Sequence, residues 1–294
     1  MSARRQASHY LLTVRCDAPL HHGAFDAGDT GNAVLFRRMP LAPDPTVTVP
    51  AFSGNALRGA LRRVVMRDLL DRCDLALGVL PPIAWDRLYA ALANGGHLDS
   101  AETRVDPEAM RALRDAVPAL SVLGAALYSY LLPGRVSIGW LWPVCRETVD
   151  SGLVEWPEEA AEVVALAGAE ELVTEVSLVR HVDRDQQDPA RSGVTPMPVT
   201  VEALIPGTVL MGSVVAMRLL TPVELGVIGW GLDQLTTLGA KGAAGFGRVT
   251  IRHEIPAAPY EAWREDAAAI ARAREALCGI VGEAVPAGLA GAAA

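Results

Sequence analysis

The hydrophobic and polar positions alternate in short runs near both ends of the chain. The segment 9–16, HYLLTVRC, is rich in β-forming residues and predicts the first strand. The other segments with a strand pattern are 134–144, 173–182, 197–207, 208–220 and 246–255. We therefore expect a sheet whose strands come from both halves of the sequence.

A helical pattern follows the first long irregular segment, at residues 52–70. Ser53 suits the N-cap, because its hydroxyl can accept a hydrogen bond from a free backbone N–H of the first turn. The apolar positions of this helix are Leu57, Leu61, Val64 and Val65. They form one stripe, as a helix with one buried face requires.

The clearest helix signals lie at residues 221–239. Thr221 can cap this helix, and Glu224 completes a capping box with it. The apolar stripe consists of Leu225, Ile228, Leu232 and Leu235. Gly239 stands where the helix is expected to end. A last helix is predicted at residues 260–279.

Strands near both ends with helices between them indicate an α+β fold. A ferredoxin-like (RNA-recognition-motif-type) antiparallel sheet, elaborated by insertions, suits the order of the segments best. Residues 75–132 look mostly helical and are interpreted as an insertion that covers one side of the core. Residues 183–193 contain no large apolar residue, so 176–204 is expected to form a long projecting hairpin. The whole chain, 1–294, is interpreted as one elaborated domain.

The composition narrows the class of protein. With 51% hydrophobic residues, the 294-residue chain can bury a sizeable core, and no uninterrupted apolar run is long enough for a membrane span. The apolar stretch near the basic start is short, so no signal peptide is expected. The four cysteines lie far apart and form no CxxC pair. This favours a reducing cytoplasm over a zinc site or a disulfide framework.

The net charge of −8 would by itself argue against a nucleic-acid partner, but the charge is unevenly distributed. Residues 1–72 contain ten arginines and six acidic residues, whereas the remainder contains 16 basic and 28 acidic residues. Clustered cations can bind phosphate even on an acidic protein. The ratio of 25 arginines to one lysine is explained by codon bias and says nothing about function.

The segment 238–251, LGAKGAAGFGRVTI, places four glycines within nine residues, around the only lysine of the chain, Lys241. A P-loop needs GxxxxGK[ST] between a strand and a helix, and a dinucleotide fingerprint needs GxGxxG after a strand. Neither fits the spacing or the helix–loop–strand order of this segment. One interpretation is a surface of backbone donors suited to an extended anionic chain. The alternative is a tight connection that binds no ligand.

The first helix carries two pairs of arginines. Arg58 and Arg62 are one turn apart, as are Arg63 and Arg67, so each pair shares a face. The first pair lies near the helix N-terminus, where free N–H groups and the helix dipole also favour phosphate. A phosphate-binding face is one interpretation, and a solvated arginine face is the other.

Three pieces of the sequence carry a resemblance to a known family. PAFSGNALRGALRR, at 50–63, resembles the start of the first helix of CRISPR-associated proteins of the repeat-associated mysterious protein (RAMP) superfamily. LGAKGAAGFGRVTI resembles the glycine-rich loop and last strand of that superfamily. Residues 204–239 resemble the strand and helix that lead into that loop. The order and spacing of the three pieces extend over most of the chain.

The resemblance implies a repeating backbone subunit of a CRISPR effector complex in antiviral defence. Such subunits coat the guide RNA (crRNA) as a head-to-tail helical filament in the cytoplasm, beside other subunits, and present it to a complementary target. The hairpin 176–204 resembles the thumb of these subunits, which kinks the guide and displaces a nucleotide at intervals. No cofactor is implied. The implied RNA contacts are Ser53, Asn55, Arg58, Arg62, Arg180, His181, Met197, Lys241, Gly242 and Gly245.

One departure from the family bears on catalysis. Backbone subunits of type III complexes that cut target RNA carry a catalytic aspartate in the loop after the first strand. The matching stretch of this chain is 28–38. It has Gly31 in the place of that aspartate, and Asp29 lies two residues earlier. The sequences of this stretch and of FSGNALRG resemble those of type IV backbone subunits instead. We therefore expect a non-catalytic subunit. The alternatives are a metal-dependent, target-RNA-cleaving subunit that uses Asp29, and a monomeric RNA-binding domain.

Two other clusters contain possible metal ligands: His21 and His22 with Asp17 or Asp26, and Asp183, Asp185 and Asp188. Adjacent histidines do not share a face in a strand or a helix, which weakens the first cluster. The second has no glycine or glutamate at the spacing of an EF-hand. No metal site is expected.

Overall fold

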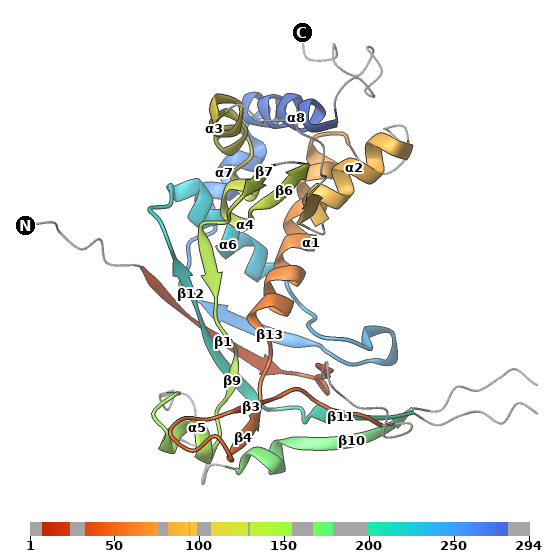
Figure 1. Ribbon diagram of the computed structural model, residues 1–294, viewed down its shortest axis with the longest axis vertical. Helices are drawn as coiled ribbons and strands as arrows, with labels where there is room; N and C mark the ends of the chain where they lie inside the picture. The colour runs from red at the N-terminus through yellow and green to blue at the C-terminus, as the bar shows by residue number, and fades with distance from the viewer. Residues whose placement is uncertain are drawn as a thin grey trace, which may run out of the picture.

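The computed structural model describes residues 8–23, 33–75, 82–93, 95–98, 107–128, 130–154, 167–178 and 199–281. Helices and antiparallel strands are mixed along the chain, so the predicted α+β class is confirmed. Figure 1 shows a curved central sheet with most of the helices gathered around a small sheet at one end, and with further small sheets at the other. None of the helices within these ranges is both long and apolar enough to cross a membrane.

The strands of the central sheet lie in the order β13 (Val249–His253), β1 (His9–Cys16), β12 (Val209–Ala216) and β8 (Val136–Ile138). A fifth strand, β9 (Trp142–Pro143), also pairs with β12. Every pair is antiparallel. The predicted first strand, 9–16, is confirmed. Side chains alternate between the two faces of β1: Val14 is fully buried, whereas Leu11 is 65% exposed. One face of the sheet therefore packs on the core.

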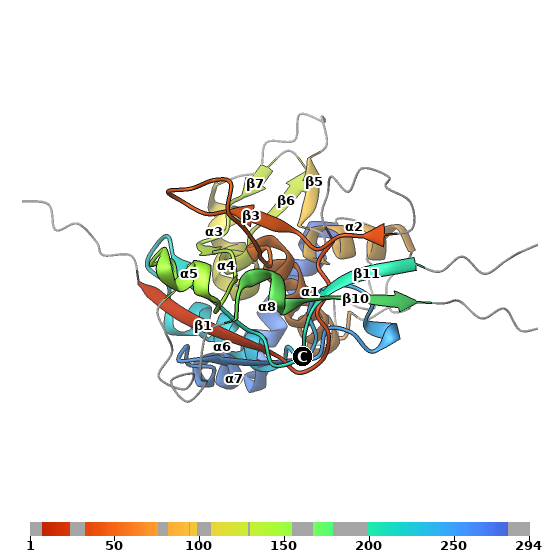
Figure 2. The same cartoon turned by 90° about the horizontal axis from the view of Figure 1, so that it is seen from below.

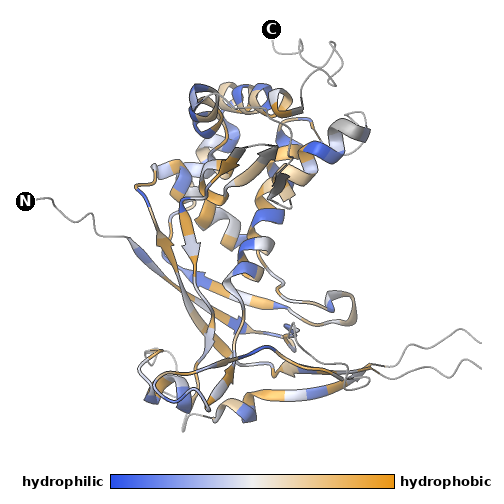
Figure 3. Ribbon diagram, in the orientation of Figure 1, coloured by the Kyte–Doolittle hydropathy of each residue, from blue (hydrophilic) through white to orange (hydrophobic). Residues whose placement is uncertain are grey.

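Two helices, α1 (Gly54–Arg72) and α6 (Pro222–Asp233), pack beside each other in the core that covers this face. In Figure 3, α1 changes between hydrophilic and hydrophobic bands along its length, as expected of a helix with one buried face. A Cβ at Gly231 of α6 would lie 2.4 Å from Cδ1 of Leu61 on α1. Glycine at this position lets the two helices pack closely, and a larger residue would require the Leu61 side chain to shift.

The predicted N-terminal signals of both helices are confirmed. The Ser53 hydroxyl accepts a hydrogen bond from the Asn55 N–H, and Leu57 and Leu61 are fully buried. At α6, the Thr221 hydroxyl accepts from the Glu224 N–H while the Glu224 carboxylate accepts from the Thr221 N–H. This is the predicted capping box.

The predicted end of α6 at Gly239 is wrong, because the helix ends at Asp233. After this residue the chain turns away to pair with the strand that follows the loop. The Leu238 N–H donates to the Gly247 carbonyl at 2.8 Å, and Thr237 forms an isolated bridge with Arg248. These backbone bonds replace those of the last helical turns.

The single last helix predicted at 260–279 is also wrong, because the chain forms two helices, α7 (Ala258–Glu265) and α8 (Ala267–Val281). Asp266 has extended backbone angles and separates them. Its carboxylate accepts hydrogen bonds from Ala268 N at 2.9 Å and Ala269 N at 3.3 Å, so it caps the second helix.

The predicted insertion contains the helices α2 (Pro82–Ala93), α3 (Pro107–Ala116) and α4 (Pro118–Leu123). It also contains a small sheet that the sequence pattern did not reveal. Its strand order is β5 (Gly96–Leu98), β6 (Ala125–Tyr128) and β7 (Tyr130–Leu132). Short apolar runs such as those of β6 and β7 do not distinguish a buried strand from a buried helix, which explains why these two strands were not predicted.

A group of short elements occupies the end opposite the helices. Strands β10 (Val173–Leu178) and β11 (Val199–Leu204) pair antiparallel, and β11 pairs parallel with β2 (Ala33–Val34). The same end contains β3 (Arg38–Pro40), β4 (Thr48–Pro50), α5 (Arg146–Asp150) and the 3₁₀ turn η2 (Ala169–Leu172). Figure 2 shows β10 and β11 side by side. Residues 179–198 lie outside the described ranges, so the projecting hairpin stays a prediction.

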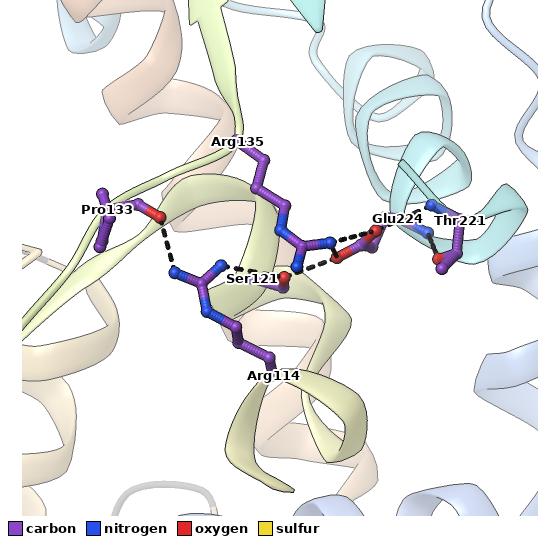
Figure 4. Close-up of polar contacts among 6 residues, drawn as sticks. All are labelled: Arg114, Ser121, Pro133, Arg135, Thr221 and Glu224. Carbon is purple, nitrogen blue, oxygen red and sulfur yellow. Dashed lines mark hydrogen bonds and ion pairs between the residues drawn. The ribbon is translucent and has the colours of Figure 1, made fainter. Parts of the chain in front are cut away.

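Glu224 also joins the helical insertion to the core. Its carboxylate is buried and accepts hydrogen bonds from Ser121 Oγ of α4 at 2.5 Å and from Arg135 Nη1 at 2.8 Å. Figure 4 shows these two side chains converging on Glu224, with Arg114 of α3 reaching Ser121 from the other side. One carboxylate thus connects α4, α6 and the segment before β8.

Candidate nucleic-acid interface

The glycine-rich loop is held open by an unusual backbone conformation at Lys241. Its φ of 67° and ψ of 25° lie in the left-handed region, which costs a residue with a Cβ about 1 kcal/mol or more. The Lys241 carbonyl accepts hydrogen bonds from the N–H groups of Ala244 and Phe246, and the Phe246 side chain is buried. These contacts hold the strained residue in place, with its ammonium-bearing side chain exposed.

The four glycines of this loop divide into two kinds. A Cβ at Gly239 would lie 2.3 Å from the His21 carbonyl oxygen, and a Cβ at Gly247 would lie 2.1 Å from that of Leu238. These two glycines are needed because the chain packs against itself. By contrast, nothing lies within 4 Å of a Cβ built at Gly242 or Gly245. The loop therefore closes tightly at its base and leaves open space at its tip.

His21 and His22 connect this loop to the start of α1. The His21 carbonyl accepts a hydrogen bond from the Ala240 N–H at 3.1 Å, and its ring Nδ1 lies 2.6 Å from the Glu202 carbonyl of β11. The ring Nε2 of His22 accepts from the Ser53 N–H at 3.2 Å. The two implied contact regions, the loop and the helix start, thus meet through adjacent histidines.

The surroundings of His22 keep its ring neutral. Burial lowers the pKa of His22 to about 4, and the positive charge of Arg37 and the nearby His21 ring contribute. Its ring lies against Phe52 with a centroid distance of 4.6 Å. Among the described residues, no group of three or more His, Cys, Asp or Glu side chains is placed to hold a metal ion. Asp26 and Asp183–Asp188 lie outside those residues.

At the start of α1, Ser53 is buried and its hydroxyl is used by the cap, whereas Asn55 is exposed. A Cβ at Gly54 would lie 2.2 Å from the Ile138 carbonyl oxygen. This glycine lets the helix start touch the strand β8. Of the three residues, only Asn55 offers its side chain to solvent.

Arg58 and Arg62 share a face, as predicted, but this face points into the protein. Arg62 is 8% exposed, and its guanidinium donates to the Leu123 and Gly124 carbonyls, both at 2.7 Å. It also donates to the Leu92 carbonyl at 3.4 Å, while Arg58 donates to Leu123. Burial, together with Arg58, lowers the pKa of Arg62 to about 10. These guanidinium groups therefore have a structural role, which the sequence pattern does not reveal.

Glu202 is another residue that the sequence did not single out. Its carboxylate accepts hydrogen bonds from the Phe36 N–H and from Arg38 Nη1, both at 2.8 Å. Arg38 also pairs with Glu170, and these hydrogen bonds to Glu170 and Glu202 raise the pKa of Arg38. The network fixes β11 beside residues 36–38. Glu202 lies more than 160 residues after Phe36 and Arg38, so no local sequence pattern indicates that they are in contact.

The remaining predicted site residues, Arg180, His181 and Met197, lie outside the described ranges, as do Asp29 and Gly31. What was predicted for them therefore stays a prediction. The ends of β10 and β11 next to residues 179–198 lie on the same side of the molecule as the glycine loop (Figures 1 and 2). The loop, the histidine pair and this strand pair are brought together.

Comparison with known proteins gives matches among solved structures only. No protein-family model and no curated protein matches the chain. A chain of a structure titled "Type IV-B CRISPR Complex" aligns with a TM-score of 0.56 and 19% identity, over 84% of this chain and 90% of that chain. This chain shares its fold with a CRISPR-complex subunit. The resemblance inferred from the sequence is thus confirmed at the level of the fold.

Two further structures align less well. A chain of "Cryo-EM structure of the Type III-B Cmr-beta bound to cognate target RNA" gives a TM-score of 0.45 and 11% identity over 84% of this chain and 97% of that chain. The chain of "Crystal structure of Thermofilum pendens Csc2" gives a TM-score of 0.40 and 17% identity over 84% of this chain and 65% of that chain.

Proposed function

We propose that this protein is a repeating guide-RNA-binding backbone subunit of a type IV CRISPR effector complex. The observation that carries the proposal is the open tip of the glycine loop, where Lys241 is held in a left-handed conformation beside two uncrowded glycines. Strained backbone at a residue with an exposed charge is typical of ligand-binding sites. The shared fold supports the same proposal.

The order of the central strands supports a ferredoxin-like sheet. When β1, β8, β12 and β13 are numbered 1 to 4 along the chain, the sheet order is 4-1-3-2. The helix α1 follows the first of these strands, and α6 lies between the third and the fourth. This βαββαβ arrangement is that of the ferredoxin-like motif. The paired β10 and β11 would then form the base of the thumb.

An RNA backbone suits the loop better than a nucleotide base edge does. A lysine ammonium acts as a point charge for phosphate, and exposed backbone N–H groups can donate to phosphate oxygens. Contacts of this kind bind any sequence and leave base edges free to pair with a target. We therefore propose Lys241, Gly242, Gly245 and Asn55 as contacts with the RNA backbone. The Gly245 N–H already donates to the Gly242 carbonyl, so Gly245 would contribute open space and not a donor. Arg58 and Arg62 would support the site from within.

Replacing Lys241 is expected to weaken RNA binding about equally for all sequences. Lys241→Ala and Lys241→Gly both remove the charge, and the glycine variant also relieves the backbone strain, so its fold is secure. Because each variant removes one ion pair with a phosphate, each should lower the slope of log affinity against log salt by about 0.7. Lys241→Arg should keep most of the affinity. A reduction restricted to one base sequence, measured by filter binding, would contradict the phosphate proposal.

Assembly should depend on RNA. With guide-length RNA the protein is expected to form regular helical arrays in electron micrographs, because head-to-tail contacts that do not close give filaments. Ribonuclease treatment should dissolve them. Closed rings or single subunits under the same conditions would contradict the backbone role, and single subunits would favour a monomeric RNA-binding domain.

A further inference from the structure

A cavity outside the proposed guide site lies between α1 and α2. Its volume is about 350 Å³, within the range of roughly 300–1,000 Å³ of small-ligand sites. Figure 1 shows α2 at the helical end of the molecule, beside the later part of α1 and away from the glycine loop. The lining residues are Arg63, Met66, Arg67, Leu70, Asp71, Trp85, Tyr89 and Ala93.

One wall of the cavity carries two cations without partners. Arg63 and Arg67 are exposed and one turn apart on α1. Within the described part of the chain, neither guanidinium forms a hydrogen bond or an ion pair. Asp71, one turn further on, is exposed in the same row. Two adjacent guanidinium groups that are not neutralised favour an anion, and their planar donors match phosphate.

The other wall carries two aromatic rings. Trp85 and Tyr89 are one turn apart on α2 and stack with a centroid distance of 5.7 Å and an interplanar angle of 30°. Tyr89 is 43% exposed, so this large ring remains partly open to solvent. Met66 and Leu70 of α1 are buried and contribute apolar surface. Exposed aromatic rings beside cations are the elements with which proteins bind single-stranded nucleic acid.

We propose that this cavity binds one nucleotide unit of a nucleic-acid strand, independently of the glycine loop. The base would lie against Tyr89, and the phosphate would accept hydrogen bonds from Arg63 and Arg67. Asp71 would accept a hydrogen bond from a sugar hydroxyl or a base amino group. The aromatic wall favours a nucleotide over an acidic peptide, because a base can stack on Tyr89 and a carboxylate cannot. The chemistry is a phosphorylated nucleoside, whether part of a strand or free.

The test uses the full chain in the Lys241→Gly background, so that the loop site is weakened and its remaining contribution is the same in every arm. A hexauridine oligonucleotide, its deoxy counterpart and free AMP are titrated separately by calorimetry. Tyr89→Ala should weaken binding about 5- to 150-fold, because one base–aromatic stack contributes roughly 1–3 kcal/mol. Arg67→Ala should weaken binding and lower the salt slope by about 0.7. Arg111→Ala, an exposed arginine outside the cavity, is the matched control.

Each outcome decides the proposal. Loss of oligonucleotide binding in both cavity variants, with the control unchanged, supports a strand, and the same pattern with AMP supports a free nucleotide. No binding, or binding that none of the variants changes, overturns the proposal. Sensitivity to Arg67→Ala alone overturns the stacking role, and tighter binding of hexaglutamate than of hexauridine overturns the choice of nucleic acid. A failure here leaves the loop proposal untouched, because the loop site is weakened equally in every arm and none of the cavity variants changes it.

Discussion

Arg62→Ala is expected to lower the free energy of unfolding by about 3 kcal/mol or more. The guanidinium of Arg62 is buried and donates to three carbonyls, those of Leu92, Leu123 and Gly124. Hydrogen bonds to a charged group contribute about 1.5–3 kcal/mol each, and buried carbonyls left without donors add to the cost. The carbonyls belong to the helical insertion, so the variant should loosen it from α1.

Urea unfolding followed by circular dichroism measures this effect. Arg63→Ala is the matched control, because Arg63 is the next residue of the same helix and is exposed. We expect the control to change the free energy of unfolding by less than about 0.5 kcal/mol. If Arg62→Ala leaves the unfolding midpoint unchanged and reduces only RNA affinity, the phosphate contact inferred from the sequence is correct and the structural role is not.

The contrast between the two arginines shows how far the sequence pattern reaches. Spacing along a helix places Arg58 and Arg62 on one face, and the structure confirms this. The pattern cannot tell what covers the face, because the covering carbonyls lie about 30 and 60 residues further along the chain. Phosphate oxygens and backbone carbonyls are both hydrogen-bond acceptors, so the same residues suit either partner.

Signals carried by adjacent residues were predicted well. The strand 9–16, the Ser53 cap and the Thr221–Glu224 capping box depend on residues within one turn or one strand, and the structure contains all three. The end of α6 depends on a backbone pairing of Leu238 with Gly247 beyond the helix, and it was misplaced. Helix ends are set by competing contacts, which local propensity does not describe.

The glycine loop was predicted in part. Its departure from nucleotide-binding motifs was visible in the spacing, and its open tip at Gly242 and Gly245 agrees with a surface for a ligand. The sequence could not separate these two glycines from Gly239 and Gly247, which are needed for packing. For Gly239 the distinction depends on the His21 carbonyl, more than 200 residues earlier in the chain, and for Gly247 it depends on how the loop folds back onto the Leu238 carbonyl.

Glu224→Ala is expected to lower the free energy of unfolding by about 3 kcal/mol. The side chain of Glu224 is 6% exposed and that of Arg135 is 27% exposed, and their closest N–O distance is 2.8 Å. Removing the carboxylate leaves the Arg135 charge partly buried without its partner, and it also leaves the Ser121 hydroxyl without its acceptor. Because Arg135 is partly exposed, the loss should lie at the lower end of the range for buried pairs, roughly 3–5 kcal/mol.

Two variants separate the causes of this loss. Ser121→Ala removes one neutral donor and should cost about 1 kcal/mol, while Glu254→Ala, at an exposed carboxylate after β13, should cost less than about 0.5 kcal/mol. Hydrogen exchange should show faster opening of α4 in Glu224→Ala than in the parent, because this carboxylate connects α4 to α6 (Figure 4). A Glu224→Ala protein that unfolds at the same urea concentration as Glu254→Ala would show that the network does not stabilise the fold.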